Sequence, residues 1–328
     1  ALTRDYVETD LRSIYGDRVH YAADAFDGLR IMDGIVNAGA TETSSAPRSA
    51  GTAVTQSASP SERPNTILHG QPRRSVLESP TVWCPPFFGT CCVTHDLDSL
   101  LDGLDTRVLF QARWGYKQGK RSDAEYAEHI RKEAQPALDA TIAAARRENL
   151  FRIRGVYGFF RCRAAGNELA ILDETGNTEA LFAFPRQAHE PGLCLADFFS
   201  GSREDVVVLW AATAGPRVAE KEAGLMKAKK YRDYLHIHGL GVELAERAAA
   251  ATASLAVKAL AGQAVPPRAL RFSFGFPACP NLTSQRDLLR LLDAERIGIT
   301  LTETCQMDPE LSVSGLLTLH PQACYFQP

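Results

Sequence analysis

An unusual run of residue types, RFSFGFPACP, occupies positions 271–280. Arg271 begins the run, aromatic residues alternate through it, Gly275 interrupts them, and prolines flank Ala278 and Cys279. A guanidinium can bind a carboxylate through two hydrogen bonds, and a glycine lets the backbone approach a ligand closely. A lone arginine is more often a surface ion-pair partner, and such aromatic residues are more often core. The run by itself therefore leaves binding and structural roles open.

Three other groups of residues are of types that often carry chemistry. His236 and His238, in HIHG, lack a third ligand and an acidic partner at helical spacing, so we predict no metal site. The GLG at 239–241 lacks the third glycine and the preceding strand of a dinucleotide fingerprint, and we assign it no cofactor. Asp197 in CLADFF is expected to stabilise a turn or a buried network rather than to act as a base.

The eight cysteines are scattered, which indicates free thiols rather than disulfides. None forms a CxxC pair, and two adjacent cysteines cannot easily present both sulfurs to one zinc ion. In apolar surroundings a cysteine usually behaves as a small buried hydrophobic residue. The eight are Cys84, Cys91, Cys92, Cys162, Cys194, Cys279, Cys305 and Cys324.

Composition and charge restrict the classes of function. The 328 residues, 45% hydrophobic and 23% charged, can bury one large core or two smaller ones. A net charge of -3 offers no broad positive field, so nucleic acid is not an expected partner. No apolar run approaches the roughly 20 residues that cross a bilayer, and the N-terminus lacks signal-peptide features. We therefore expect no membrane association and a cytoplasmic location.

Composition also divides the chain into three parts: 1–36, 37–80 and 81–328. In the first part, a helix capped by Thr3 and ended by Gly16 precedes a short strand at 18–22, and Asp24 can cap a second helix. One strand and two helices cannot close a core by themselves. The second part is rich in Ser, Thr, Ala, Pro and Gly and is predicted to be a flexible linker. The third part is predicted to form one domain.

Within 81–328 the sequence predicts a helix, then strands, then helices. Ser122 and Glu125 form a capping box for a helix that Pro136 interrupts, and a second helical stretch runs to about Asn149. An antiparallel meander is predicted for three β-rich segments, and two more strands are predicted to continue it. The three are GVYGFFRC (155–162), NELAIL (167–172) and ALFAF (180–184); the two are CLADFF (194–199) and DVVVLWAAT (205–213).

Helix is predicted again from near Leu225 to about Ala261, interrupted by Gly239 and Gly241. A last helix is predicted before Gly298, carrying Leu288, Leu291, Leu292 and Glu295. Runs of strands followed by runs of helices favour an α+β fold over a doubly wound sheet.

An ordered series of motifs resembles one known family. The run at 271–280 is similar to the RxxxGYPACP motif of the reactivation domain of cobalamin-dependent methionine synthase, with Phe276 in place of the usual tyrosine. The likeness covers 81–328 and is far more specific than any single motif. Its other segments are PPFFGT (85–90), RWGYKQGK (113–120), FPRQ (184–187), CLADFF (194–199), YRDYLHIHGLGVELAE (231–246), LTE (301–303) and HPQACY (320–325).

The resemblance implies a mostly antiparallel, twisted sheet with flanking helices and a site for S-adenosylmethionine. By resemblance, Arg271 would hold the methionyl carboxylate, Glu246 would receive the ammonium group, and Gly275 would let the backbone come close. Asp105 is the candidate for a family aspartate that opens a helix, whereas a second acidic contact of the family has no counterpart here. The other contacts implied are Ser273, Phe276, Tyr325 and Phe326.

Residues 1–36 resemble the last helix, strand and helix of the family's cobalamin-binding domain, which has a flavodoxin-like α/β sheet. The resemblance implies that the chain is truncated before Ala1. It places Ala25 near the nucleotide tail of cobalamin, although a small residue at a helix start explains Ala25 equally well. The cobalt-ligating DxHxxG motif, the zinc cysteines for homocysteine and the folate module are absent from this sequence. Cobalamin would therefore be held mainly by a missing or separate domain.

The function implied is that of a reactivation module within a methyltransferase of methionine biosynthesis, in which S-adenosylmethionine remethylates cobalamin after one-electron reduction of cob(II)alamin. The expected partners are the cobalamin-binding domain and a flavodoxin-like or ferredoxin-like reductant. Lys227, Lys229, Lys230 and Arg232 are candidates for the basic surface that such a reductant needs, or form a solvated helix face. Two alternatives are a stand-alone S-adenosylmethionine-binding protein and a non-catalytic docking module of a split synthase.

Overall fold

The computed structural model describes residues 81–188, 191–260 and 269–328, together with positions 12, 16, 19–22, 31, 76 and 79. The chain separates into two compact units, Ala1–Arg63 and Pro64–Pro328. In the first unit Arg12 and Ile31 are helical, whereas residues 19–22, predicted in a strand, have no regular structure. β-prone residues form a strand only when a neighbour pairs their backbone groups. Ala25 and the predicted flavodoxin-like arrangement lie outside the described residues.

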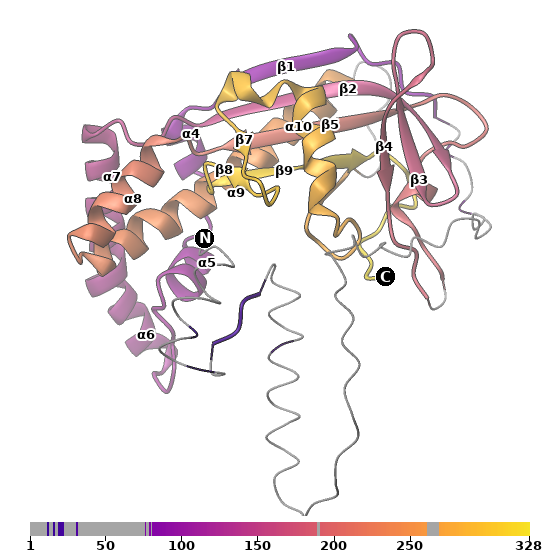
Figure 1. Cartoon of the computed structure of the whole chain (residues 1–328). Helices are drawn as coiled ribbons and strands as arrows, with labels where there is room; N and C mark the ends of the chain where they lie inside the picture. The colour runs from indigo at the N-terminus through magenta and orange to yellow at the C-terminus, as the bar shows by residue number, and fades with distance from the viewer. Residues whose placement is uncertain are drawn as a thin grey trace, which may run out of the picture. The chain divides into compact units, whose positions relative to one another are not determined.

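Antiparallel strands form the frame of the second unit. The described strands are β1 (Gly89–Thr94), β2 (Arg154–Ala165), β3 (Glu168–Leu172), β4 (Thr178–Ala183), β5 (Asp205–Thr213), β6 (Leu270–Ser273), β7 (Thr300–Leu301), β8 (Met307–Asp308) and β9 (Ser312–Thr318). In the main sheet their order is β4-β3-β2-β5-β9-β6 (Figure 1). The long β2 pairs with β1 along its first half and with β3 along its second half. β6 is therefore at one edge of the described sheet.

Helices surround this frame. They are α4 (Leu97–Leu101), α5 (Thr106–Val108), α6 (Asp123–His129), α7 (Gln135–Arg147), α8 (Arg217–Lys227), α9 (Tyr231–Leu260) and α10 (Gln285–Leu292). Figure 1 shows α7 and α8 at one end of the sheet and the hairpin of β3 and β4 at the other. Among the described helices, none combines the length and the apolar character that spanning a bilayer requires.

Two hydrophobic cores flank the sheet because alternate side chains of a strand point to opposite faces. On β5, Val208 and Trp210 belong to the core that α7 and α9 cover. Val207 and Leu209, on the same strand, belong to the core beneath α10. A mostly antiparallel sheet covered by helices on both faces confirms the predicted α+β class. The predicted domain boundary at residue 81 stays a prediction, and Val76 already packs against the second core.

Helix α9 runs without a break through Gly239 and Gly241, so the predicted interruptions are wrong. A Cβ on Gly239 would lie 2.7 Å from atoms of the Trp114 indole, and a Cβ on Gly241 would overlap the side chain of Leu311. These glycines therefore allow other segments to pack closely against the helix. The helical conformation persists because the helix packs against β5, β2 and β9, which outweighs the low helix propensity of glycine.

The meander of β2, β3 and β4 is confirmed. The strand predicted at CLADFF is wrong, because Leu195–Phe198 forms a 3-10 turn in which the Asp197 carboxylate accepts the N–H of Cys194. The strand predicted at 205–213 exists as β5, but it pairs with β2 rather than continuing outward from β4. Strand β9, which the sequence reading missed, lies between β5 and β6.

The capping box of Ser122 and Glu125 is confirmed at the start of α6. A π-helical turn, Ile130–Ala134, joins α6 to α7, and Pro136 lies in the first turn of α7, where a missing N–H is tolerated. The last predicted helix is shorter than expected. α10 ends at Leu292 because Asp293 adopts a left-handed conformation with φ 50°, and Glu295 belongs to a following 3-10 turn.

Candidate ligand-binding site

Strand β6 positions Arg271 at the edge of the described sheet. In the register with β9, Arg271 lies opposite Leu317 and Phe272 lies opposite Leu316. Leu317 belongs to the core under α9, whereas Leu316 and Phe272 belong to the core under α10. The alternation of β6 therefore directs Arg271 and Ser273 away from the core that holds Phe272.

A tight turn follows β6 and exposes Phe276. Gly275 has a φ of 94°, a conformation that a residue with a Cβ rarely adopts. The Gly275 N–H donates to the carbonyl of Cys279 at 2.9 Å, and the Cys279 thiol contacts the carbonyl of Ser273 at 2.8 Å. Burial raises the pKa of the Cys279 thiol to about 12, so the protonated thiol stays available as a donor. Cys279 is structural, and the turn leaves 64% of Phe276 exposed.

The C-terminal segment lies against the same strand. The rings of Tyr325 and Phe326 lie 5.4 Å and 6.3 Å from the ring of Phe272. Phe326 also contacts Phe198 with ring centroids 6.2 Å apart, whereas Tyr325 remains 67% exposed. The C-terminal aromatic pair and the 271–280 run, which are separated in the sequence, are thus brought together.

These segments line an open surface cavity of about 600 Å³, a size suited to a small-molecule ligand. Five of the predicted contact residues line it, namely Arg271, Ser273, Phe276, Tyr325 and Phe326. Gly275 shapes the turn at its rim. The remaining lining residues are Phe272, Pro277, Ala278 and Gln327.

The Arg271 side chain is half-buried, and within the described ranges its guanidinium forms no hydrogen bond or ion pair. Its Cζ lies 5.7 Å from the ring centroid of Trp210, a fully buried residue of β5. A guanidinium that is partly desolvated and unpaired attracts an anionic group strongly. Arg271 therefore gives the cavity a free positive charge that is suited to a carboxylate.

Glu246 and Asp105 do not line this cavity, so the structure does not place them together with the five predicted contacts that do. Glu246 is exposed on α9, and the next residue, Arg247, packs so closely on Gly103 that a Cβ there would overlap the guanidinium. The segment before α5 therefore lies beside α9 near Glu246. Asp105 does open a helix, because its Oδ1 accepts the N–H groups of Arg107 and Val108 at 3.0 and 3.1 Å.

A buried ion pair stabilises the turn that carries Phe198, the residue that packs against Phe326 of the cavity. Arg186 contacts both carboxylate oxygens of Asp197, at 2.7 and 2.8 Å, and also donates to Asn167 Oδ1 and the carbonyl of Gly192. The Asp197 carboxylate accepts the N–H of Cys194 as well. The expectation that Asp197 belongs to a buried network is confirmed.

The other chemical candidates have structural roles in the described part of the chain. The ring of His236 packs against Trp114 with centroids 4.4 Å apart, and Nδ1 of His238 lies 3.1 Å from Glu222. No group of three or more potential metal ligands occurs among the described residues. In the described part of the chain no disulfide is formed by Cys91, Cys92, Cys162, Cys194, Cys279, Cys305 or Cys324.

Sequence reasoning missed two residues that support the cavity. Trp210 lies beneath Arg271, and a tryptophan in an otherwise aliphatic strand was the available signal. Gln187 donates from Nε2 to the carbonyl of Gln327 at 2.6 Å, and no local pattern indicated this contact. A partly buried Arg113–Glu243 contact of 2.9 Å was also missed because its partners are far apart in the sequence.

The antiparallel sheet with helices on both faces defines the class of this protein as an α+β domain. A ligand-sized cavity lies beside the edge strand of its sheet. The model of the family "Vitamin B12 dependent methionine synthase, activation domain" matches residues 86–328. The chain belongs to this family, as the resemblance implied.

Two relatives and one solved structure agree with this assignment. The methionine synthases of Mycobacterium tuberculosis and Mycobacterium leprae are each 32% identical to this chain, in alignments that cover 99% of it. This chain spans 31% of the length of each relative. A crystal structure of the MetH reactivation domain bound to AdoHcy has the same fold, with a TM-score of 0.67 and 24% identity. The match covers 75% of this chain and 83% of that one.

Proposed function

We propose that this chain is the reactivation module of a cobalamin-dependent methionine synthase and binds S-adenosylmethionine in the cavity beside β6. The observation that carries the proposal is the unpaired guanidinium of Arg271 at a cavity with aromatic walls. The ligand named for the similar reactivation domain and the names of the two relatives support the same conclusion. The proposed role is to present a methyl group for the reductive remethylation of cob(II)alamin.

The residues act by positioning the ligand. Arg271 holds the methionyl carboxylate through two hydrogen bonds, and Ser273 offers a further polar contact. Gly275 keeps the backbone close to the ligand. Glu246 receives the ammonium group when the ligand extends from the cavity toward α9, with Asp105 beyond it. No general base is needed, because the acceptor of the methyl group would be a metal centre, which has no proton to lose.

Exposed aromatic residues fit the cobalamin that this reaction requires. Phe276 and Tyr325 are 64% and 67% exposed at the rim of the cavity, and together they offer apolar surface that can contact the face of a corrin ring. When bound, the corrin supplies the cobalt that accepts the methyl group. A cobalamin-binding domain is the proposed partner that brings the corrin to this surface. Ala25 stays a predicted cobalamin contact outside the described residues.

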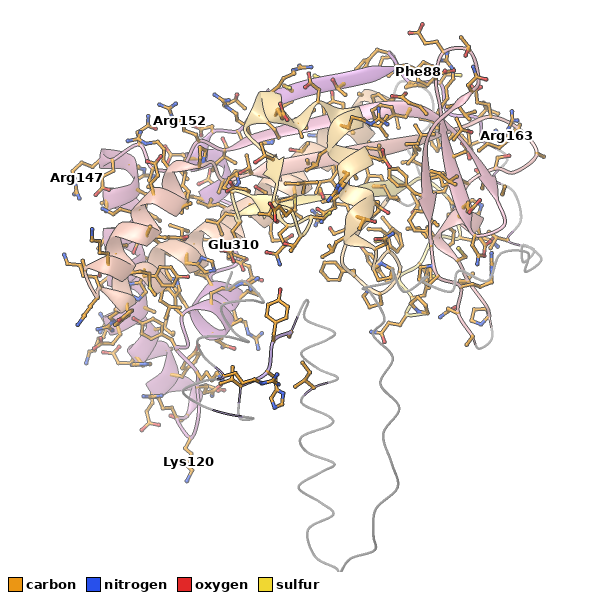
Figure 2. The ribbon with its side chains drawn as sticks, viewed as in Figure 1. Phe88, Lys120, Arg147, Arg152, Arg163 and Glu310 are labelled. Atoms are coloured by element: carbon orange, nitrogen blue, oxygen red, sulfur yellow. The ribbon has the colours of Figure 1, made fainter. Side chains whose placement is uncertain are left out.

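A basic surface is the proposed docking site for the reductant. Lys227, Lys229, Lys230 and Arg232 are all exposed where α8 meets α9. Arg232 contacts the hydroxyl of Tyr116, and this contact places α9 next to the segment that ends in the exposed Lys120 (Figure 2). Tyr231, which is 58% exposed, adds apolar area to the same surface. An acidic flavodoxin-like or ferredoxin-like protein matches this combination.

Calorimetric titration of the full chain with S-adenosylmethionine tests the proposal. Replacing Arg271 with Ala should weaken binding about 10- to 100-fold, because charged hydrogen bonds contribute roughly 1.5–3 kcal/mol. The control is Arg163→Ala, which removes an exposed arginine of β2 that does not line the cavity and should leave the affinity unchanged (Figure 2). Wild-type chain that does not bind, or an Arg271→Ala variant with full affinity, would contradict the proposed function.

A further inference from the structure

We propose that Gln187 is a positioning residue that holds the C-terminal wall of the cavity in place. The contacts of Gln187 stand independently of the proposed function, whereas their effect on ligand binding rests on that function. Residues 323–328 supply Tyr325, Phe326 and Gln327 to the cavity, and they belong to no helix or strand of the described structure. Contacts other than backbone pairing in the sheet must therefore keep this wall against β6.

Gln187 contacts the segment at its far end. Its Nε2 donates to the carbonyl of Gln327 at 2.6 Å, while its Oε1 accepts the N–H of Leu193 at 3.1 Å. Because one end of the amide can only donate and the other can only accept, the two contacts fix its orientation. The backbone N–H of Gln187 also donates to the carbonyl of Leu193 at 2.9 Å. Phe326, packed against Phe198 and Phe272, is the second point of attachment.

The base of this contact is rigid because Arg186 precedes Gln187. The Arg186 side chain is 95% buried and has acceptors on Asp197, Asn167 and the carbonyls of Gly192 and Gly166. Moving Gln187 away would pull against this buried network. The FPRQ segment therefore has two parts with different roles: Arg186 anchors the loop in the core, and Gln187 extends from it to the cavity wall.

Limited digestion with chymotrypsin, which cleaves after Tyr325 and Phe326, measures release of this wall without any ligand. Removing one net hydrogen bond should raise the released population about fivefold, and the cleavage rate in the full chain should rise equally in Gln187→Ala. Gln187→Glu should behave like Gln187→Ala, because a carboxylate keeps the contact with Leu193 but cannot donate to Gln327. The control is Gln118→Ala, which removes a half-buried glutamine that also donates to a backbone carbonyl, and its cleavage rate should equal that of the wild type.

Two further measurements separate positioning from general stability. The urea midpoint of Gln187→Ala should stay close to the wild-type value, whereas its affinity for S-adenosylmethionine should fall about fivefold. Cleavage of Gln187→Ala at the wild-type rate would overturn the proposal. Faster cleavage with unchanged affinity would also overturn it, because the segment would then be no wall of the ligand site. If the wild-type chain binds no S-adenosylmethionine, the proposed function fails, while the cleavage rates still decide whether Gln187 holds the segment.

Discussion

Asp197 and Arg186 form an ion pair from which water is almost excluded, since 0% and 5% of their side chains are exposed. Replacing Asp197 with Asn would leave a buried guanidinium without its counter-charge, and we expect a loss of about 3 kcal/mol in the free energy of unfolding. The control is Glu179→Gln, which removes an exposed contact of 2.9 Å between one carboxylate oxygen and Arg290 and should cost less than about 1 kcal/mol. Urea unfolding of both variants measures the difference. Equal losses would show that burial does not determine the contribution of the Arg186 pair.

The chemistry of single residues could be predicted where a neighbour in the sequence constrained it. Asp197 in CLADFF was expected to stabilise a turn or a buried network, and the family resemblance of the 271–280 run implied that Arg271 and Gly275 contact a ligand. Gln187 could not be predicted in the same way. Its partner lies 140 positions away, and only the path of the C-terminal segment across the sheet brings the two together. Glu246 and Asp105 remain predictions as ligand contacts.

At the scale of the helix, Gly224 and Gly239 have the same low helix propensity, but only Gly239 is closely packed. Nothing lies within 4 Å of a Cβ placed on Gly224 of α8, whereas a Cβ on Gly239 of α9 would lie 2.7 Å from the Trp114 indole. Gly224→Ala should therefore stabilise the protein by about 0.5–1 kcal/mol. Gly239→Ala should destabilise it by about 1–3 kcal/mol, because overpacking outweighs the gain in helix propensity. Chemical denaturation distinguishes them, and stabilisation by both variants would contradict the close packing at Trp114.

The difference between local structure and packing against distant segments explains which elements could be predicted. Periodicity and turn residues were sufficient for β2, β3 and β4, because a meander is a local structure with short connections. The continuity of α9 depended on packing against β5, β2 and β9, which the sequence does not reveal at Gly239. CLADFF was predicted as a strand from its hydrophobic residues, but the hydrogen bond from Cys194 to the Asp197 carboxylate folds it into a turn.

At the scale of the whole molecule, the sequence supported the α+β class but not the order of strands. β6 and β9 pair with each other and join β5, although more than 50 residues separate β5 from β6 in the chain. This order places Arg271 at the edge of the described sheet and brings the C-terminal segment beside it. The cavity is thus a product of the topology, whereas the residue types that line it were recognisable from the sequence.

The stability of the whole domain should decrease in mildly acidic solution because two histidines are half-buried. Nε2 of His95 lies 2.8 Å from the hydroxyl of Thr252, and burial lowers the pKa of the His95 imidazole below its ordinary value of 6.5. Burial also lowers the pKa of His236, which packs against Trp114. Between these lowered values and 6.5 the unfolded chain binds more protons than the folded chain, so the free energy of unfolding falls as the pH falls.

Replacing His95 with Gln should reduce this pH dependence, because the amide can still contact Thr252 but does not titrate. We expect the urea midpoint of the wild type to decrease between pH 7.5 and 5.5 more steeply than that of the variant. Above pH 7.5 the two curves should run parallel, since both histidines are then neutral in the folded and unfolded chains. An identical slope for wild type and variant below pH 6.5 would show that His95 accepts a proton as readily in the folded domain as in the unfolded chain.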